Sequence, residues 1–150
     1  METVLSIIAI ILSVISGGFS LYAFIWTAHR DRKQATLEAY NRLQHEVFDN
    51  LNQYRPADIA EICKDRKSKD YKTISGYLAR IEHFCVGLNE DIYDKNTFYA
   101  LCHGYFDGVQ IRNRIEPLIN SKNSLNTGNK QFYNDTIEVL AWMDKKAGKQ

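Results

Sequence analysis

The first 28 residues contain no lysine, arginine or histidine, and Glu2 is their only charged side chain. Residues 4–26 carry no charge at all over 23 positions. An α-helix needs ~20 apolar residues to cross the hydrocarbon core of a bilayer. A cleavable signal peptide would need a basic start and a shorter apolar core. The sequence therefore predicts a retained membrane anchor over residues 1–27, with the span at about 4–26.

Sequence motifs of common catalytic sites are also missing. The chain has no Walker phosphate loop, no GxGxxG and no GxSxG. Its four histidines make no pair with a carboxylate at metal-ligand spacing. Cys102 and His103 are adjacent, so on a helix they point about 100° apart and cannot share a proton. We therefore expect a protein that is not an enzyme and that uses no metal or cofactor.

Cysteine is scarce, and the three cysteines form no CxxC pair. Cys85 and Cys102 lie among apolar neighbours in the sequence, and Cys63 completes an odd number. In a cytosolic domain, such cysteines are typical of reduced thiols in the core.

Small side chains follow one seam of the apolar segment. The a and d positions of a strict seven-residue repeat hold Ser6, Ala9, Ser13, Ser16, Ser20, Ala23 and Thr27. Membrane helices associate through small side chains and hydroxyl bonds, because lipid supplies no hydrophobic drive. A seven-residue period favours a left-handed supercoil. We expect self-association along this seam, with two alternatives: serines that bond only to their own backbone, and rings of Ser6, Ser13 and Ser20 that line a polar passage.

Positive charge begins directly after the anchor, at His29, Arg30, Arg32 and Lys33. The positive-inside rule then predicts a single-pass protein of the bacterial inner membrane, with its N-terminus outside and its C-terminal domain in the cytoplasm. After residue 27 the chain has 19 basic and 17 acidic residues, a net charge of only +2. Domains that bind duplex nucleic acid are usually strongly basic, so we expect no such partner.

The remainder, residues 28–150, is predicted to be a cytosolic helical bundle, which makes the fold all-α. No Pro or Gly interrupts residues 28–54, so the anchor is expected to continue into a first helix that ends before Pro56. Its inward positions are predicted at Leu37, Tyr40, Leu43, Val47, Leu51 and Tyr54. A short apolar segment, 59–63, precedes the charged stretch 64–72. That stretch is expected to be a solvated loop, or alternatively a contact with anionic lipid or phosphate.

Three further helices are predicted from helical spacing. The first covers about 71–88, with Tyr71, Ile74, Leu78, Ile81, Cys85 and Leu88 on its buried stripe. The second starts at the N-cap Asp94 and is ended or kinked by Pro117, with Phe98, Leu101, Tyr105 and Val109 turned inward. Residues 120–130 are a predicted loop. The last helix ends before Gly148 and carries Tyr133, Ile137, Leu140 and Met143.

The predicted helix from Asp94 carries the best candidate for a ligand surface. His103, Gln110 and Arg114 follow i, i+7, i+11 spacing and share a face. Asn113, Tyr99 and Phe106 flank that face. Arg112 and Arg114 both lie near the predicted C-terminal end of this helix. Guanidinium groups bind phosphate through fixed donors, and aromatic rings stack on bases. The alternative is that the arginines bind carbonyls and acids near the helix end and that the rings belong to the core.

The stretch 74–142, which begins ISGYLARIEHFCVGLNEDIYDKNTFYALCHGYFDGVQIRNRIEPLI, resembles an uncharacterised bacterial family of membrane-anchored helical proteins. The layout of an N-out anchor and a small helical domain is also similar to the membrane-bound accessory effectors of type III CRISPR systems. That second resemblance implies binding of cyclic tetra-adenylate, oligomerisation and membrane disruption during phage infection. It is one of architecture and supplies no ligand residue by motif.

We therefore expect a cyclic-oligonucleotide-gated effector in antiviral defence, in contact with the lipid bilayer. Its oligomer would be symmetric, and a tetramer would match a cyclic oligoadenylate of four nucleotides. The alternative function is a non-enzymatic, membrane-tethered interaction subunit that recruits a protein partner.

Overall fold

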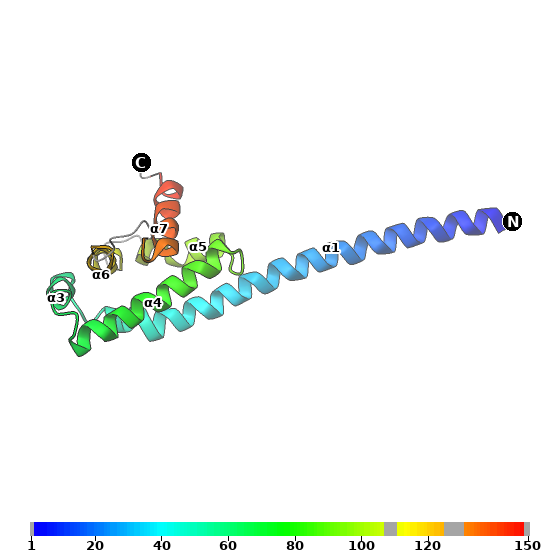
Figure 1. The fold of residues 1–150 in the computed structure, drawn as a ribbon. Helices are drawn as coiled ribbons and strands as arrows, with labels where there is room; N and C mark the ends of the chain where they lie inside the picture. The colour runs from blue at the N-terminus through cyan, green and yellow to red at the C-terminus, as the bar shows by residue number, and fades with distance from the viewer. Residues whose placement is uncertain (1, 107–110, 125–130, 149–150) are drawn as a thin grey trace.

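The computed structural model describes residues 2–106, 111–124 and 131–148. Its first element, α1, is a single helix from Glu2 to Leu43 that projects from the rest of the molecule as a rod (Figure 1). It continues through the π-helix η1 (Gln44–Phe48) into the short α2 (Asp49–Leu51). The predicted continuity between the anchor and the following helix is confirmed.

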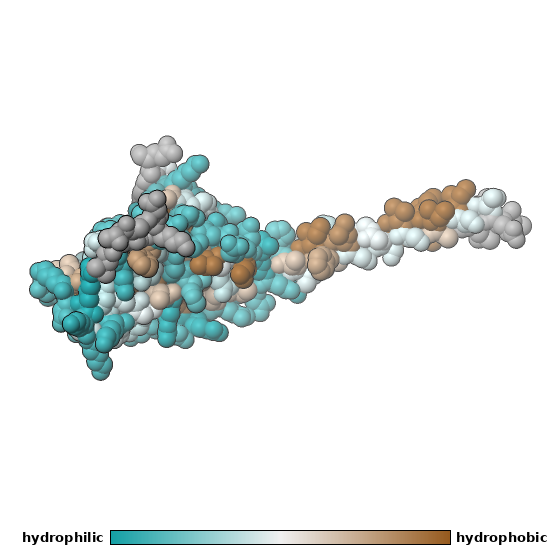
Figure 2. Space-filling view, in the orientation of Figure 1, coloured by the Kyte–Doolittle hydropathy of each residue, from teal (hydrophilic) through white to brown (hydrophobic). Residues whose placement is uncertain are grey.

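The projecting part of α1 is apolar and uncovered. Figure 2 shows hydrophobic residues along the rod and a mostly hydrophilic surface over the domain. Its large apolar side chains, such as Phe19 and Val14, are 72% and 70% exposed. Within the described residues, one helix is long and apolar enough to cross a membrane, and none of its most apolar window is buried. The chain thus fits a single-pass membrane protein with its span near the N-terminus.

Five further helices complete the domain, and the described residues contain no strand. They are α3 (Pro56–Ile62), α4 (Lys69–Asn89), α5 (Lys95–Phe106), α6 (Arg112–Asn123) and α7 (Asn134–Lys146). In Figure 1, α4 runs back along the C-terminal part of α1, toward the membrane segment. Helix α7 packs on α4, α5 packs on α1, and α6 packs on α3. The predicted all-α fold is confirmed.

The core forms where α1, α4 and α5 meet. Phe48 and Phe98 are completely buried, and the Tyr40 ring stands edge-on to both, with centroids 6.2 Å away in each case. Phe84 of α4 adds another edge-on contact to Phe98 at 5.2 Å. All six predicted stripe positions of α4 are buried: Tyr71, Ile74, Leu78, Ile81, Cys85 and Leu88. This stripe was predictable because a helix packed on both sides along its length shows one clear apolar period.

Helix α7 is held at its start by a side chain from α4. The Glu82 carboxylate accepts hydrogen bonds from the Asp135 and Thr136 backbone N–H groups, at 3.2 and 2.9 Å, and from the Thr136 hydroxyl. The preceding residue, Tyr133, has a left-handed backbone (φ 63°) and no capping side-chain bond. Glu82 therefore supplies the N-terminal cap that the local sequence lacks.

The predicted helix from Asp94 to Pro117 is wrong as a single element. Asp94 does cap α5, because its Oδ1 accepts from the Thr97 N–H at 2.6 Å, but α5 ends at Phe106 and a new helix starts at Arg112. Pro117 lies inside α6, which extends to Asn123, so the loop predicted from Asn120 starts too early. A proline removes one helical hydrogen bond, and the buried Ile115, Leu118 and Ile119 hold α6 by packing.

Two predicted inward positions are also wrong. Leu37 is 44% exposed and Leu101 is 39% exposed. On α1 the domain packs against the face of the buried Thr36 and Tyr40, which turns Leu37 to the outside. The Tyr105 side chain and Val109, the other inward positions predicted for this region, lie outside the described residues.

The charged stretch 64–72 forms a turn and the start of α4, at the end of the domain farthest from the N-terminus (Figure 1). Arg66 bonds through its guanidinium to the Ser121 carbonyl at 2.8 Å and to the Ser124 hydroxyl at 3.3 Å. This part of the domain therefore anchors the C-terminal end of α6. Its distance from the apolar segment argues against the alternative of a lipid contact.

Candidate functional site

The two arginines of the predicted ligand surface lie in the first turn of α6 and bind other parts of the domain. Arg112 forms an ion pair with Asp144 of α7 at 2.9 Å, and it also donates to the Leu140 carbonyl at 3.3 Å. Its Nε is buried and has no hydrogen-bond partner among the described residues. Arg114 donates from Nε to the Tyr54 carbonyl at 2.8 Å. Both arginines therefore make contacts of the kind that the alternative interpretation expects, namely bonds to carbonyls and acids.

The other members of the predicted surface are placed only in part. Asn113 is exposed on α6, beside the two arginines. The side chain of His103 and all of Gln110 lie outside the described residues. His103 and Arg114 belong to the separate helices α5 and α6, so these two residues do not lie on one helical face. The arginines consequently stand at the N-terminal end of a helix, and the predicted C-terminal position is wrong.

The seam of α1 is exposed along its length, from Ser6 to Thr27. The Ser13 hydroxyl donates to the Ala9 carbonyl at 2.9 Å, and the Ser20 hydroxyl donates to the Ser16 carbonyl at 3.0 Å. These bonds are those of the alternative in which serines satisfy their own backbone. Each hydroxyl oxygen retains acceptor capacity toward a neighbouring helix, so self-association stays a prediction.

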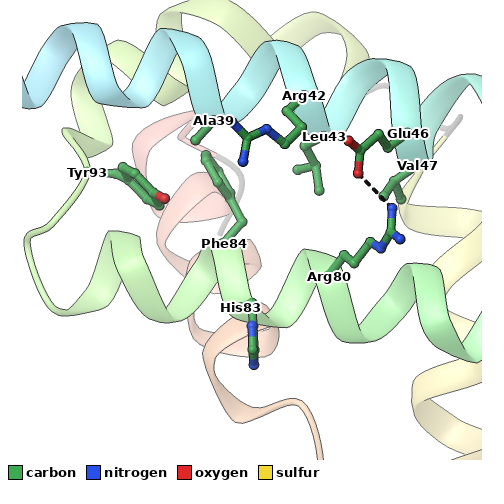
Figure 3. Close-up of a pocket in the computed structure, with 9 residues that line it drawn as sticks. All are labelled: Ala39, Arg42, Leu43, Glu46, Val47, Arg80, His83, Phe84 and Tyr93. Atoms are coloured by element: carbon green, nitrogen blue, oxygen red, sulfur yellow. Dashed lines mark hydrogen bonds and ion pairs between the residues drawn. The ribbon is translucent and has the colours of Figure 1, made fainter.

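A groove that the sequence did not suggest lies between α1 and α4 (Figure 3). It encloses about 360 Å³ and is lined by Ala39, Arg42, Leu43, Glu46, Val47, Arg80, His83, Phe84 and Tyr93. Figure 3 shows the His83 ring pointing away from α1, whereas Glu46 and Arg80 face each other across the groove. Its floor is apolar and its rim is charged.

Two arginines, Arg80 and Arg42, lie on the rim of the groove and differ in their pairing. Arg80 bonds Glu46 at 2.7 Å, an ion pair whose side chains are both more than half exposed. Arg42 has no hydrogen-bond or ion-pair partner in the part of the chain that the structure describes. Sequence reasoning missed this groove because Glu46 and Arg80 are 34 residues apart. Nothing in the local pattern connects them.

Close packing at one end of the groove depends on a glycine. The Tyr93 ring stacks on Phe84 with centroids 5.1 Å apart, and it lies over Gly87 of α4. A Cβ on Gly87 would meet the Tyr93 ring at 2.5 Å, well inside van der Waals contact. Gly87 therefore allows Tyr93 to reach its place in the groove wall.

The cysteines are free thiols, as predicted, and two of them are buried. Burial raises the pKa of the Cys85 thiol to about 12, so this group stays protonated at neutral pH. Among the described residues, no cluster of three or more metal-ligand side chains occurs.

Comparison with known families gives one match. The model of a domain of unknown function, DUF4760, matches residues 8–141. The chain belongs to this family. The match begins within the apolar part of α1 and ends within α7, so it covers most of the apolar segment and of the helical domain. No curated protein and no solved structure matches the chain.

Proposed function

We propose that the chain is a membrane-anchored, oligomeric, non-enzymatic effector. Its helical domain binds a ligand on the cytoplasmic side of the bacterial inner membrane and thereby changes the state of the membrane segment. The observation that supports this best is α1, one helix of 42 residues that contains the candidate span and ends in the domain core. No Gly or Pro lies between Gly18 and Pro56 to act as a hinge. Movement of the domain is therefore passed directly to the span.

The ligand we propose is a cyclic oligonucleotide, with cyclic tetra-adenylate the member implied by the resemblance to type III CRISPR effectors. Such a ligand repeats its phosphates by symmetry. A symmetric oligomer presents the same donors once per subunit, which lets a domain of low net charge hold a polyanion. Binding that favours one arrangement of the domains would shift the arrangement of the attached helices.

The proposed ligand residues remain His103, Gln110, Arg112, Asn113 and Arg114. The Asn113 side chain is exposed and has no hydrogen bond within the described part of the chain, so it is the freest side-chain donor of the described members of the set. A guanidinium has five N–H donors. Arg112 bonds Asp144 and the Leu140 carbonyl through its two terminal nitrogens, and its Nε has no partner within the described residues. These contacts and the bond of Arg114 to the Tyr54 carbonyl fix the first turn of α6 beside Asn113.

Isothermal titration of the full chain in detergent micelles against cyclic tetra-adenylate tests this proposal. We expect saturable binding that falls by at least tenfold in Asn113→Ala/Arg114→Lys, a variant that keeps the charge at position 114. Arg55→Lys is the control, because Arg55 is exposed at the start of α3 and pairs only with the local Asp58 among the described residues. Absence of any binding by the intact chain would contradict the proposal.

A second candidate is the membrane-tethered interaction subunit, favoured by the groove between α1 and α4. Its apolar floor and the unpaired Arg42 suit a partner segment with apolar and acidic side chains. Arg42→Glu should then abolish co-purification of that partner from membranes, whereas Lys69→Glu, at the far end of the domain, should not. Equal recovery with both variants would remove this candidate.

A further inference from the structure

A second hollow lies between α1 and the start of α5, on the side of the domain nearest the apolar segment. It encloses about 420 Å³ and is lined by His29, Lys33, Asp94, Asn96, Thr97 and Ala100. The hollow is built by a specific contact, because the Asp94 backbone N–H donates to the hydroxyl of the buried Thr36 at 2.7 Å. This bond fixes the first turn of α5 beside α1.

The length of α1 places this hollow close to the bilayer surface. His29 and Lys33 follow Trp26 by three and seven residues, or ~4.5 and ~10 Å along a helix axis. The polar headgroup layer adds ~5–8 Å to each side of the hydrocarbon core. If the span ends at Trp26, His29 lies within the headgroup layer and Lys33 reaches back to it. The two side chains are four residues apart and so share one face of α1.

Polar groups of the hollow are arranged to receive an anion. His29 and Lys33 are exposed, and neither has a hydrogen-bond or ion-pair partner within the described part of the chain. Asn96, exposed on α5, adds an amide, although the Lys146 ammonium bonds its oxygen. The lining also contains one acid, Asp94, whose Oδ1 accepts from the Thr97 N–H. Its negative charge is offset by Arg32 as well as by Lys33, so Lys33 is not its sole counter-charge.

We propose that this hollow binds the phosphate of an anionic phospholipid headgroup in the leaflet next to the domain. Lys33 supplies the charge, and His29 and Asn96 supply further donors. Bound lipid would hold α5 and α1 together at the membrane surface and fix the height of the domain above it. The inference rests on the proposed function in one respect, namely that α1 crosses the bilayer.

Native mass spectrometry of the full chain tests the site. The chain is released from micelles that contain equal amounts of phosphatidylglycerol and phosphatidylcholine, and the retained lipid is identified. We expect the wild type to retain phosphatidylglycerol in preference to phosphatidylcholine. Lys33→Gln should lower that preference about fivefold, the effect of one Lys near an anionic surface, and Lys33→Arg should preserve it.

Lys69→Gln is the matched control, because Lys69 is also an exposed lysine and starts α4 at the far end of the domain (Figure 1). Equal retention of the two lipids by the wild type would overturn the proposal, as would an equal loss in Lys69→Gln. Complete displacement of the lipid by excess inorganic phosphate would show a free-anion site and also overturn it. Circular dichroism of each variant verifies that the domain is folded.

Failure of the anchor would be seen separately. If alkaline carbonate releases the wild-type chain from cell membranes, α1 does not span the bilayer and the proposed function fails. If the chain stays in the membrane but shows no lipid preference, the headgroup site alone is wrong.

Discussion

The two halves of the helical rod formed by α1, η1 and α2 carry similar apolar side chains in opposite surroundings. Phe19 in the N-terminal half is 72% exposed, whereas Phe48, in the continuation of the same helical rod, is completely buried. In a protein dissolved in water, a row of exposed Ile, Leu and Phe would be unfavourable, and lipid removes that penalty. The contrast fits a helical rod with two environments, because the described residues before Thr36 are not buried and those of the domain core begin there.

The largest expected effect comes from removing a large side chain on the domain side. Phe48→Ala should lower the free energy of unfolding of the domain by ~3–5 kcal/mol, because it leaves a cavity in the core. Thermal unfolding followed by circular dichroism in micelles measures the loss. Phe19→Ala is the matched control and should leave the melting temperature of the domain unchanged. Equal destabilisation by both changes would contradict the division of the helical rod into two environments.

The second largest effect is expected from a charge introduced into the membrane half of α1. Val14→Lys adds a cation near the middle of the span, which opposes insertion by ~2.5–3.5 kcal/mol. A large fraction of the chain should then be extracted from membranes by alkaline carbonate. Leu37→Lys makes the same change on an exposed face beyond the span and should leave the chain membrane-bound. A Val14→Lys protein that resists extraction as fully as the wild type would argue against the span.

Within the domain, the ion pair between α6 and α7 should have a smaller effect. Arg112→Ala removes charge-assisted bonds to Asp144 and to the Leu140 carbonyl, at a loss of ~1.5–3 kcal/mol, reduced by partial exposure of the pair. The melting temperature should fall together with any ligand affinity. Arg55→Ala removes a fully exposed local pair and should not change the melting temperature. An unchanged melting temperature in Arg112→Ala would mean that the pair is not structural.

The serine seam should give weaker effects per residue. Ser13→Leu/Ser20→Leu should reduce cross-linked oligomers in micelles, since hydroxyl bonds between membrane helices contribute ~0.6–1.7 kcal/mol each. Gly17→Leu, off the seam, should matter less. A cross-linking ladder identical to that of the wild type would show that the serines bond only to their own helix, as Ser13 and Ser20 do in the isolated chain.

The smallest effect concerns Asp94. Burial acts to raise the pKa of Asp94, but the Thr97 hydrogen bonds and the charges of Lys33 and Arg32 outweigh it, so its pKa lies below the ordinary value. The ionised group therefore contributes stability at neutral pH that is lost as the pH falls through the pKa of the folded state. Asp94→Asn keeps the cap and should lower stability by at most ~1 kcal/mol. The difference in melting temperature from the wild type should vanish at strongly acidic pH; a constant difference would contradict this role.

The sequence was sufficient for the features that repeat along one helix. The uncharged span, the continuity of α1 into the next helix and the six-residue stripe of α4 all follow from composition or period. The end of α5 at Phe106 was missed because the apolar period continues beyond it. Pro117 was expected to end or kink the helix, whereas α6 continues through it and is held by the packing of Ile115 and Leu118. Contacts such as Arg112 with Asp144 or Arg80 with Glu46 join residues more than 30 positions apart. No local pattern encodes those pairings. The sequence therefore did not predict the groove, and it left both a ligand role and a structural role open for Arg112.

The central claim is that one rigid helix joins the span to the domain core. Its most direct test is the distance between spin labels at Leu21→Cys and Asn41→Cys, both exposed on α1. The labels are attached to the full chain carrying Cys63→Ser. The labelled protein is diluted with unlabelled protein in lipid nanodiscs. Twenty residues of unbroken α-helix separate the labels by ~30 Å. Pulsed electron paramagnetic resonance should show a narrow distribution near that distance. A broad distribution, or one centred well below it, would show a hinge between membrane and domain and contradict the account.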